Sequence, residues 1–368
     1  MTVSIIVPMF HGKRFLDDIL NQIELCARNV EETKVELILM NDSPDEEIHV
    51  HESVYTYHVK TINPGFNSGI HGARVHALSY AVGDYVVFLD QDDKIKPTYL
   101  KEQLECIGEA DAVVCRAIYH NKLHYTNTHI FEEVVTKNFM LKKWNPIISP
   151  GQVLMRKDAI PQLWKENILK NNGADDYFLW LLMASKGSVF SLNQEILFEH
   201  VETGRNASDD TNNMMDSELE MVHILRNNNI FDEDVLINLL ESLRRMHVKQ
   251  LDNYKKAFDF LQYWTLKLSE GPSPLDFFER HNLYRIAIYG AGDLGKSIET
   301  VLKNTDVKVC FYIDQNAEFI QSKLPVYRKE CVQGEVDAVI ITIKNKAVKE
   351  EVKKLLKCPV YEVDDIWR

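Results

Sequence analysis

Short apolar runs rich in β-branched residues alternate with amphipathic segments along the first half of the chain. Such runs are typical of strands that are buried on both faces of a parallel sheet. The runs lie at residues 3–8, 34–40, 54–62, 85–89 and 112–118. Apolar residues on one face of 14–28, and the segment 69–81, predict intervening helices. Strands that alternate with helices at this spacing predict βαβ units and an α/β fold.

The periodicity becomes helical beyond residue 208. Residues 214–226 and 234–268 carry apolar positions at three- and four-residue steps, which predicts two helices. The segment SEGPSP at 269–274 is the clearest predicted linker in the chain. We therefore expect an α/β domain at 1–208, a helical connector at 209–274 and a small Rossmann-like α/β domain at 275–368.

The third part begins with a glycine-rich turn between two predicted strands, 284–289 and 307–314. The turn reads GAGDLG and places Gly290, Gly292 and Gly295 in a GxGxxG pattern, and the second strand ends in Asp314. This order is that of the dinucleotide-binding fingerprint, although the unit is about half of a two-lobed Rossmann domain. The four residues are a candidate nucleotide site. The alternative is a tight turn that only lets helix and strand approach.

Composition and charge exclude several classes of protein. The 368 residues are 45% hydrophobic and 26% charged, as in an ordinary globular protein of two or three domains. The net charge of −13 argues against nucleic acid as a partner. No apolar run approaches the length of a membrane span, and a strand pattern begins at Val3 where a signal peptide would lie. We expect a cytoplasmic protein, and peripheral contact with a membrane stays open.

The six cysteines are scattered and form no CxxC pair. They are Cys26, Cys106, Cys115, Cys310, Cys331 and Cys358. This usage indicates reduced core residues and neither a disulfide framework nor a zinc site.

Three carboxylates directly follow the apolar run at 85–89, namely Asp90, Asp92 and Asp93. Ligands of open α/β sheets bind outside the carboxyl ends of the strands. Carboxylates this close repel one another, so a divalent ion with oxygen ligands, Mn²⁺ or Mg²⁺, fits among them. A solvated acidic turn is the alternative, and these residues alone do not decide between the two.

Two further predicted strands end at the same edge of the sheet, one at Pro8 and one just before Asp42. Polar or turn residues at three strand ends predict a ligand cleft. The Asp42 carboxylate can accept a hydrogen bond from the ring N–H of a uracil or from ribose hydroxyls. The alternative for Asp42 is a turn or a helix cap.

Several runs in order resemble the nucleotide-sugar half of the family 2 glycosyltransferases, which have the GT-A fold. They read VSIIVPMF, LILMND, GARVHAL, GDYVVFLDQDD, SPGQVLMRKDAI and ADDYFLWLLMASKG, and they cover roughly residues 1–208. The resemblance implies transfer of a sugar from a nucleotide donor, usually with inversion. The run NDSP replaces the common NDGS, and Val75 stands where Asn is frequent. These departures leave the donor sugar open.

The resemblance also implies roles for particular donor-site residues. It places Asp42 on uracil, Arg74 at the diphosphate, and Asp90 with Asp92 in a DxD motif that has Gln91 between them. Pro8 belongs to the same donor set.

Two acids open a predicted helix in the run GADDYFLWLLMA. Asp175 fits an N-cap, and Asp176 would lie in the first turn, near the positive end of the helix dipole. Without the resemblance, two capping acids with no chemistry are the simpler interpretation. The family's Glu-Asp pair carries the general base in its second position, which matches Asp176.

Two later residues and three tryptophans complete the candidates. By the resemblance, His200 joins Asp90 and Asp92 at the metal or contacts the diphosphate, and an ordinary surface histidine is the alternative. Arg205 is a second candidate for the diphosphate. Trp144, Trp164 and Trp180 are interpreted as core or acceptor-wall residues.

The sequence thus predicts a metal-dependent, inverting glycosyltransferase that uses Mn²⁺ or Mg²⁺ and, with a UDP-sugar favoured, a nucleotide-sugar donor. The acceptor would be a glycan, a lipid-linked saccharide or a protein. One rival is a non-catalytic nucleotide-sugar-binding or assembly protein, and a weaker rival is an NAD-dependent enzyme. The helical connector could also mediate a homo-oligomer.

Overall fold

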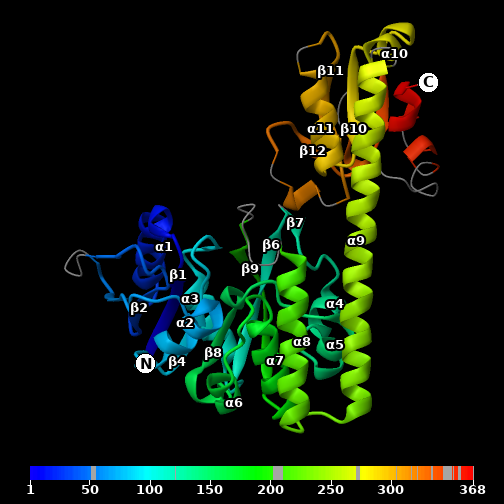
Figure 1. The fold of residues 1–368 in the computed structure, drawn as a ribbon. Coiled ribbons are helices and arrows are strands. Elements are labelled where there is room, and N and C mark those ends of the chain that lie inside the picture. Colours follow the sequence, from blue (N-terminus) through cyan, green and yellow to red (C-terminus); the bar gives the residue numbers. More distant parts are fainter. Residues whose placement is uncertain are drawn as a thin grey trace. The chain divides into compact units, whose positions relative to one another are not determined.

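The computed structural model describes residues 1–50, 55–120, 122–201, 210–270, 274–303, 305–315, 317–320, 322–332, 335–342, 350, 352–354 and 358–367. The chain divides into two compact units, Met1–Lys249 and Gln250–Arg368 (Figure 1). Each unit combines one sheet with helices, which confirms the predicted α/β class.

The first unit is built on a nine-stranded sheet in the order β3-β2-β1-β4-β8-β6-β9-β5, with β7 paired to β6. Its strands are β1 (Thr2–Met9), β2 (Lys34–Asn41), β3 (His58–Ile62), β4 (Tyr85–Phe88), β5 (Lys94–Ile95), β6 (Ala112–Tyr119), β7 (Lys122–Leu123), β8 (Val153–Arg156) and β9 (Phe190–Glu199). The strands β3, β2, β1 and β4 run parallel, and β8 is antiparallel to both β4 and β6. This mixed sheet brings the carboxyl ends of β1, β2 and β4 to one edge.

Helices cover both faces of this sheet. They are α1 (Leu16–Arg28), α2 (Gly69–Leu78), α3 (Tyr99–Ile107), α4 (Thr128–Glu133), α5 (Lys137–Lys143), α6 (Gln162–Glu166), α7 (Asp175–Ser185), α8 (Thr211–Asn227) and α9 (Glu233–Glu270). The apolar run of β1 alternates between two cores: Ile5 and Val7 pack with α1 and α3, whereas Ile6 packs with α2 and α7. Period-two alternation with both faces buried is what the continuous apolar runs predicted.

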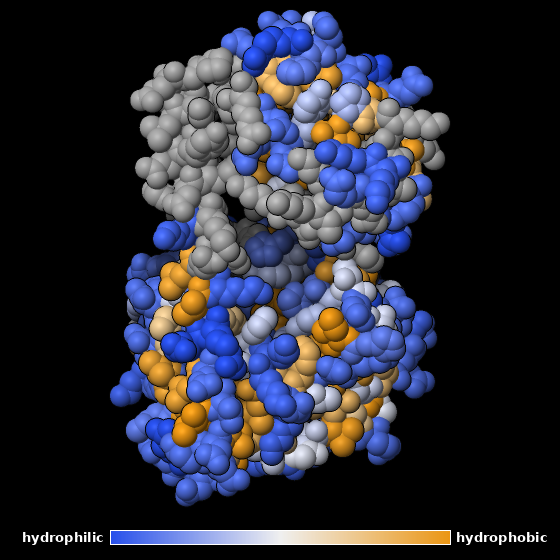
Figure 2. Space-filling view, turned by 90° about the vertical axis from the view of Figure 1, so that its right-hand side faces the viewer, coloured by the Kyte–Doolittle hydropathy of each residue, from blue (hydrophilic) through white to orange (hydrophobic). Residues whose placement is uncertain are grey.

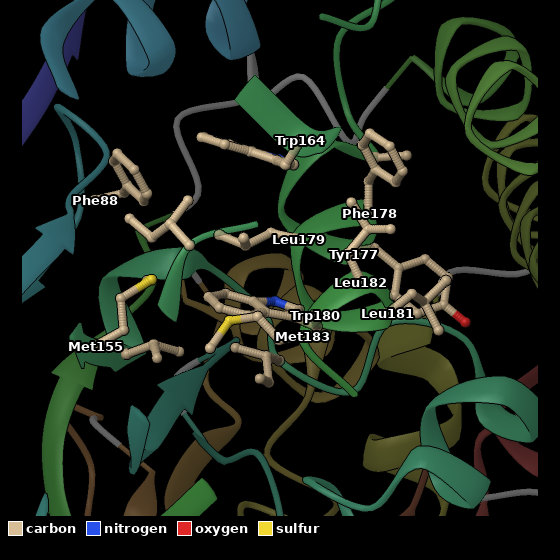
Figure 3. Close-up of a cluster of buried hydrophobic side chains, with 14 of the residues drawn as sticks. Phe88, Met155, Trp164, Tyr177, Phe178, Leu179, Trp180, Leu181, Leu182 and Met183 are labelled. Carbon is tan, nitrogen blue, oxygen red and sulfur yellow. The ribbon is translucent and has the colours of Figure 1, made fainter. Parts of the chain in front are cut away.

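The helix α7 lies in the middle of one core, and its residues from Asp175 to Ala184 are all buried. Figure 3 shows its side chains packed with Phe88, Met155 and Trp164. The prediction of Asp175 as N-cap is wrong: the cap residue is Ala174, which makes no side-chain cap hydrogen bond, and Asp175 is the first helical residue. A helix buried along its length holds the acids of its first turn in fixed positions.

The two helices predicted after residue 208 are present as α8 and α9. Of the predicted linker, 269 and 270 belong to α9, Pro274 begins α10, and 271–273 lie outside the described residues. No helix within the described ranges is long and apolar enough to cross a membrane. The face drawn in Figure 2 is mostly hydrophilic, with hydrophobic residues in several patches.

The second unit contains a five-stranded parallel sheet in the order β12-β11-β10-β13-β14. Its elements are α10 (Pro274–Arg280), β10 (Arg285–Tyr289), α11 (Asp293–Leu302), β11 (Lys308–Ile313), β12 (Val326–Tyr327), β13 (Ala338–Ile341) and β14 (Val360–Glu362). The parallel sheet agrees with the predicted Rossmann-like architecture.

All six cysteines are free, as predicted, but they are not all core residues. Cys26 and Cys115 are buried, whereas Cys331 is exposed. The core interpretation of Cys331 is therefore wrong.

Candidate active site

Arg74 connects the acidic turn after β4 with the first turn of α7. Its side chain, which projects from α2, is only 3% exposed. One nitrogen, Nη2, donates to Asp90 Oδ1 at 2.5 Å, and the other, Nη1, donates to Asp175 Oδ2 at 2.5 Å. Burial opposes the charge, but the carboxylates of Asp175 and Asp90 outweigh it and raise the pKa of Arg74. One guanidinium thus fixes the DxD candidate relative to the candidate base helix.

Asp176 is buried next to Asp175 in the first turn of α7, and both of its carboxylate oxygens accept hydrogen bonds. Asn145 Nδ2 donates to Oδ2 at 3.0 Å, and the backbone N–H of Tyr177 donates to Oδ1 at 2.6 Å. Burial and the neighbouring Asp175 carboxylate raise the pKa of Asp176 to about 7, although Arg74 and these two bonds act in the opposite direction. A carboxylate that titrates near neutral pH can accept a proton there.

Asp93 is buried one residue beyond the DxD candidate and contacts His200. His200 Nδ1 lies 2.8 Å from Asp93 Oδ1, and Ser149 Oγ donates to Asp93 Oδ2 at 2.9 Å. The same hydroxyl lies 3.3 Å from Asp90 Oδ2. Ser149 therefore joins the Asp93–His200 pair to the DxD candidate.

The pKa values of Asp93 and His200 are both raised, but for different reasons. Burial raises the pKa of Asp93 to about 6, against the hydrogen bond from His200. Burial lowers the pKa of His200, but its hydrogen bond to Asp93 and the nearby acid charges outweigh this and bring it to about 8. At neutral pH the pair is an ion pair that holds the ring of His200 in one orientation.

Asp42 lies where β2 ends and is tied to the start of α2. Its Oδ1 accepts hydrogen bonds from the N–H of Ser68 at 2.6 Å and from the Ser68 hydroxyl at 2.8 Å. Its backbone N–H donates to the carbonyl of Met9 at 2.7 Å. The structure therefore places Asp42 at the same sheet edge as Pro8 and also gives it the helix-anchoring role that the sequence left as an alternative.

Gln91 holds the loop after β1. Its Oε1 accepts from the N–H of Phe10 at 3.0 Å, and its Nε2 donates to the Phe10 carbonyl at 3.1 Å. A Cβ at Gly12 would lie 2.0 Å from that Oε1, so the clamp requires glycine there. Phe10 itself is 48% exposed beside these residues. Sequence reasoning missed Phe10.

Of the remaining predicted site residues, the structure describes Asp92 and not Arg205. Asp92 lies in the turn between Asp90 and Asp93 and is partly buried, and Arg205 lies outside the described residues. Among the side chains that the structure describes, no group of three or more His, Cys, Asp or Glu is arranged to hold a metal ion. The predicted metal set of Asp90, Asp92 and His200 stays a prediction.

Two partners in the site, Ser149 and Asn145, were missed by sequence reasoning, and so was the pairing of Asp93 with His200. Asp93 itself was predicted as one of three carboxylates around a divalent ion. Ser149 begins the run SPGQVLMRKDAI but was given no role, Asn145 lies four residues before it, and only the fold brings the two side chains to the acids.

In the second unit the glycine turn is tight and packed. Gly290 has φ +106°, and a Cβ at Gly295 would lie 2.1 Å from the carbonyl oxygen of Gly290. The Asp314 carboxylate accepts a hydrogen bond from the N–H of Ala291 at 3.0 Å. These contacts give the glycines and the acid structural roles, and binding of a nucleotide by Gly290, Gly292, Gly295 and Asp314 stays a prediction.

Comparison with known proteins concerns mainly the first part of the chain. Residues 4–164 match the family model described as glycosyl transferase family 2. An uncharacterized glycosyltransferase of Rickettsia conorii is 21% identical over 69% of this chain and 43% of its own length.

Two further relatives match shorter segments. The UDP-Glc:alpha-D-GlcNAc-diphosphoundecaprenol beta-1,3-glucosyltransferase WfaP of Escherichia coli is 27% identical over 50% of this chain and 71% of its own length. An uncharacterized glycosyltransferase of Haemophilus influenzae is 32% identical over 32% of this chain and 46% of its own length. The chain spans less than half the length of the Rickettsia and Haemophilus relatives.

Proposed function

Residues 4–164 belong to glycosyl transferase family 2, and on that basis we propose that the protein is a metal-dependent, inverting glycosyltransferase. It moves a sugar from a nucleotide-sugar donor to a hydroxyl of a glycan, a lipid-linked saccharide or a protein. A UDP-sugar is the favoured donor, because WfaP is named as a UDP-glucose-dependent transferase. The family predicted from the sequence motifs is confirmed.

The observation that carries the proposal is the pair of bonds from Arg74 to Asp90 and Asp175. Asp176, the neighbour of Asp175, has a pKa of about 7. Arg74 therefore sets the distance between a proton acceptor and the turn proposed to meet the diphosphate. A binding protein without turnover has no need for a base held in this way.

In the proposed reaction Asp176 takes the proton of the acceptor hydroxyl. The acceptor oxygen forms a bond to the anomeric carbon from one face, and the bond from that carbon to the diphosphate oxygen breaks on the other. The electron pair of the broken bond leaves with the nucleoside diphosphate, so the configuration inverts. A base with a pKa near the working pH is the effective kind, and it contributes about 10²–10⁴-fold.

The charges of the described site fit a divalent cation. Asp90, Asp92, Asp93, Asp175 and Asp176 supply five carboxylates, against the cationic side chains of Arg74 and His200. A nucleoside diphosphate would add further negative charge, which such a site repels without a cation. Asp92 and Asp90 would hold the ion, and His200 would join them only as the neutral ring, after loss of the proton that it carries in its ion pair with Asp93. When bound, the ion would act as a Lewis acid that offsets the charge developing on the leaving diphosphate.

The donor side is assigned to the strand ends. We propose that Asp42 contacts the nucleoside next to Pro8, and that the exposed ring of Phe10, held by Gln91, supplies an aromatic face for the base. Arg205 stays a candidate for the diphosphate.

Calorimetry of UDP binding with and without Mn²⁺ tests the donor and metal assignments. We expect Asp92→Asn to weaken Mn²⁺-dependent binding by about tenfold or more, because removal of a buried or ligating charge costs roughly 1.4 kcal/mol or more. Asp17→Asn, an exposed acid on α1, is the matched control and should bind as the wild type does. Unchanged affinity in Asp92→Asn removes Asp92 from the metal site.

Release of UDP from a panel of UDP-sugars, measured in the wild-type protein, then tests turnover. If UDP binds but no UDP-sugar is turned over with any hydroxyl acceptor, the chain is a binding protein and the proposed function is wrong.

A further inference from the structure

Trp144 is a large aromatic residue that the core does not use. Sequence analysis grouped it with Trp164 and Trp180, but the structure separates the three: Trp164 and Trp180 are fully buried, whereas Trp144 is 39% exposed. Figure 3 shows the two buried indoles within the core around α7. Of these three residues, only Trp144 can offer a face to a ligand.

The backbone of Trp144 is strained. Its φ is +65° and its ψ is −167°, a region that residues other than glycine rarely occupy. It ends α5 in this conformation even though glycine, the residue suited to it, would remove the strain. Strained residues of this kind concentrate at ligand-binding and catalytic sites. A tryptophan therefore occupies a position whose backbone conformation disfavours it.

The segment around Trp144 is held on both sides and is joined to the candidate base. The Ser242 hydroxyl donates to the carbonyl of Lys142 at 2.6 Å, and the Tyr125 hydroxyl donates to the carbonyl of Pro146 at 3.0 Å. The next residue along the chain, Asn145, donates to Asp176 at 3.0 Å. Trp144 thus lies one residue away from the side chain that binds the proposed proton acceptor.

We propose that Trp144 is the platform on which a sugar ring of the acceptor stacks, so that the acceptor is a saccharide. The proposal rests on the proposed function, because it places the acceptor at Asp176. A pyranose ring has an apolar face of C–H groups, whose burial against an indole removes apolar surface from water. Those C–H groups carry partial positive charge and match the negative face of the ring, and the hydroxyls at the rim stay free to reach a base.

A membrane surface is the competing occupant, because Lys142 and Lys143 are exposed next to Trp144. An interfacial contact of that kind requires neither the strained backbone nor the connection through Asn145 to Asp176. Both features suit a saccharide acceptor, since its hydroxyl must be held at one place relative to the base.

Saturation-transfer NMR in the absence of a donor tests the platform, with cellobiose, maltose and N,N′-diacetylchitobiose as probes. We expect saturation on the ring C–H protons of at least one disaccharide with the wild-type protein. Trp144→Ala should weaken that binding by about tenfold, as expected for one aromatic stacking contact. Trp144→Phe, which keeps an aromatic face, should retain most of it. Tyr80→Ala removes an exposed aromatic residue after α2 and is the matched control.

The outcomes separate this inference from the proposed function. Saturation that is equal in the wild type and Trp144→Ala, or absent from all three disaccharides with the wild type, overturns the platform. Trp144-dependent binding to phosphatidylglycerol vesicles without any saccharide signal makes the residue a membrane contact and also overturns it. UDP calorimetry on the same samples reports the donor site independently, and Trp144→Phe preserves the test if Trp144→Ala does not fold.

Discussion

The carboxylate of Asp176 combines deep burial with two hydrogen bonds, and its pKa of about 7 follows from the burial. A base works only when it is deprotonated, so kcat/KM of the wild type should rise with pH and level off above about 7. Asp176→Asn cannot accept a proton at these pH values, so turnover should fall by about 10²-fold or more. The loss should appear in kcat and kcat/KM alike, while UDP affinity is kept. A variant that keeps full turnover on the true acceptor would show that the base lies elsewhere.

Substitution of the neighbouring Asp175 should lower the stability of the protein. A capping aspartate tolerates asparagine, but Asp175 is paired with the buried Arg74. Asp175→Asn removes one charged partner of that guanidinium and should cost about 1.5–3 kcal/mol of unfolding free energy. Urea denaturation measures this, with the exposed Asp17→Asn as control. An unchanged midpoint would mean that Asp90 alone compensates Arg74.

The sequence pointed to candidate site residues where an acid directly follows a recognisable strand or begins a recognisable helix. Asp90 and Asp92 follow an unmistakable buried strand, and Asp176 opens an apolar helix. The partners of these acids were not predictable, because Asn145 and Arg74 lie 31 and 16 residues away from them in the chain. A single sequence carries no signal for such long-range pairing. The raised pKa of Asp176 could not be predicted from the sequence either, because it depends on burial and on neighbours that only the fold brings together.

At the scale of elements, the clamp between the loop after β1 and the turn after β4 depends on one glycine. In Gly12→Ala the added Cβ meets Gln91 Oε1 at 2.0 Å, so Gln91 must move and release Phe10. We expect UDP affinity to fall about fivefold or more, by about as much as in Gln91→Ala, because loss of two hydrogen bonds costs about 1–3 kcal/mol. The double variant should be no weaker than Gln91→Ala, since both changes remove one interaction. Calorimetry that finds additive losses would contradict the shared clamp.

Element types were largely predictable from hydrophobic periodicity, whereas the antiparallel part of the sheet was not. The strand β1 was expected at 3–8 and is found at Thr2–Met9, because a short apolar run rich in β-branched residues favours a strand buried on both faces. The helix α7 was also expected, but its cap was assigned by residue type alone. Asp175 bonds to Arg74 instead, since burial of that cation favours a carboxylate partner more than a cap does.

For the molecule as a whole, the compact units divide between Lys249 and Gln250, inside α9. No Gly or Pro lies near that point in the sequence, so composition alone could not mark it. The described side chains of the candidate site all precede residue 202. We propose on this basis that the donor site belongs to the first unit alone.

A chain that ends at Glu270, the last residue of α9, tests this proposal. It should bind UDP with Mn²⁺ within about twofold of the full chain, because it keeps every site residue assigned above, including Arg205. Gly295→Ala in the full chain is the companion variant: its Cβ would lie 2.1 Å from a backbone carbonyl, so it disturbs the glycine turn and leaves the chain length unchanged. UDP affinity should be normal in both. A folded truncation that no longer binds UDP, together with weakened binding in Gly295→Ala, would show that the GxGxxG turn contributes to the donor site.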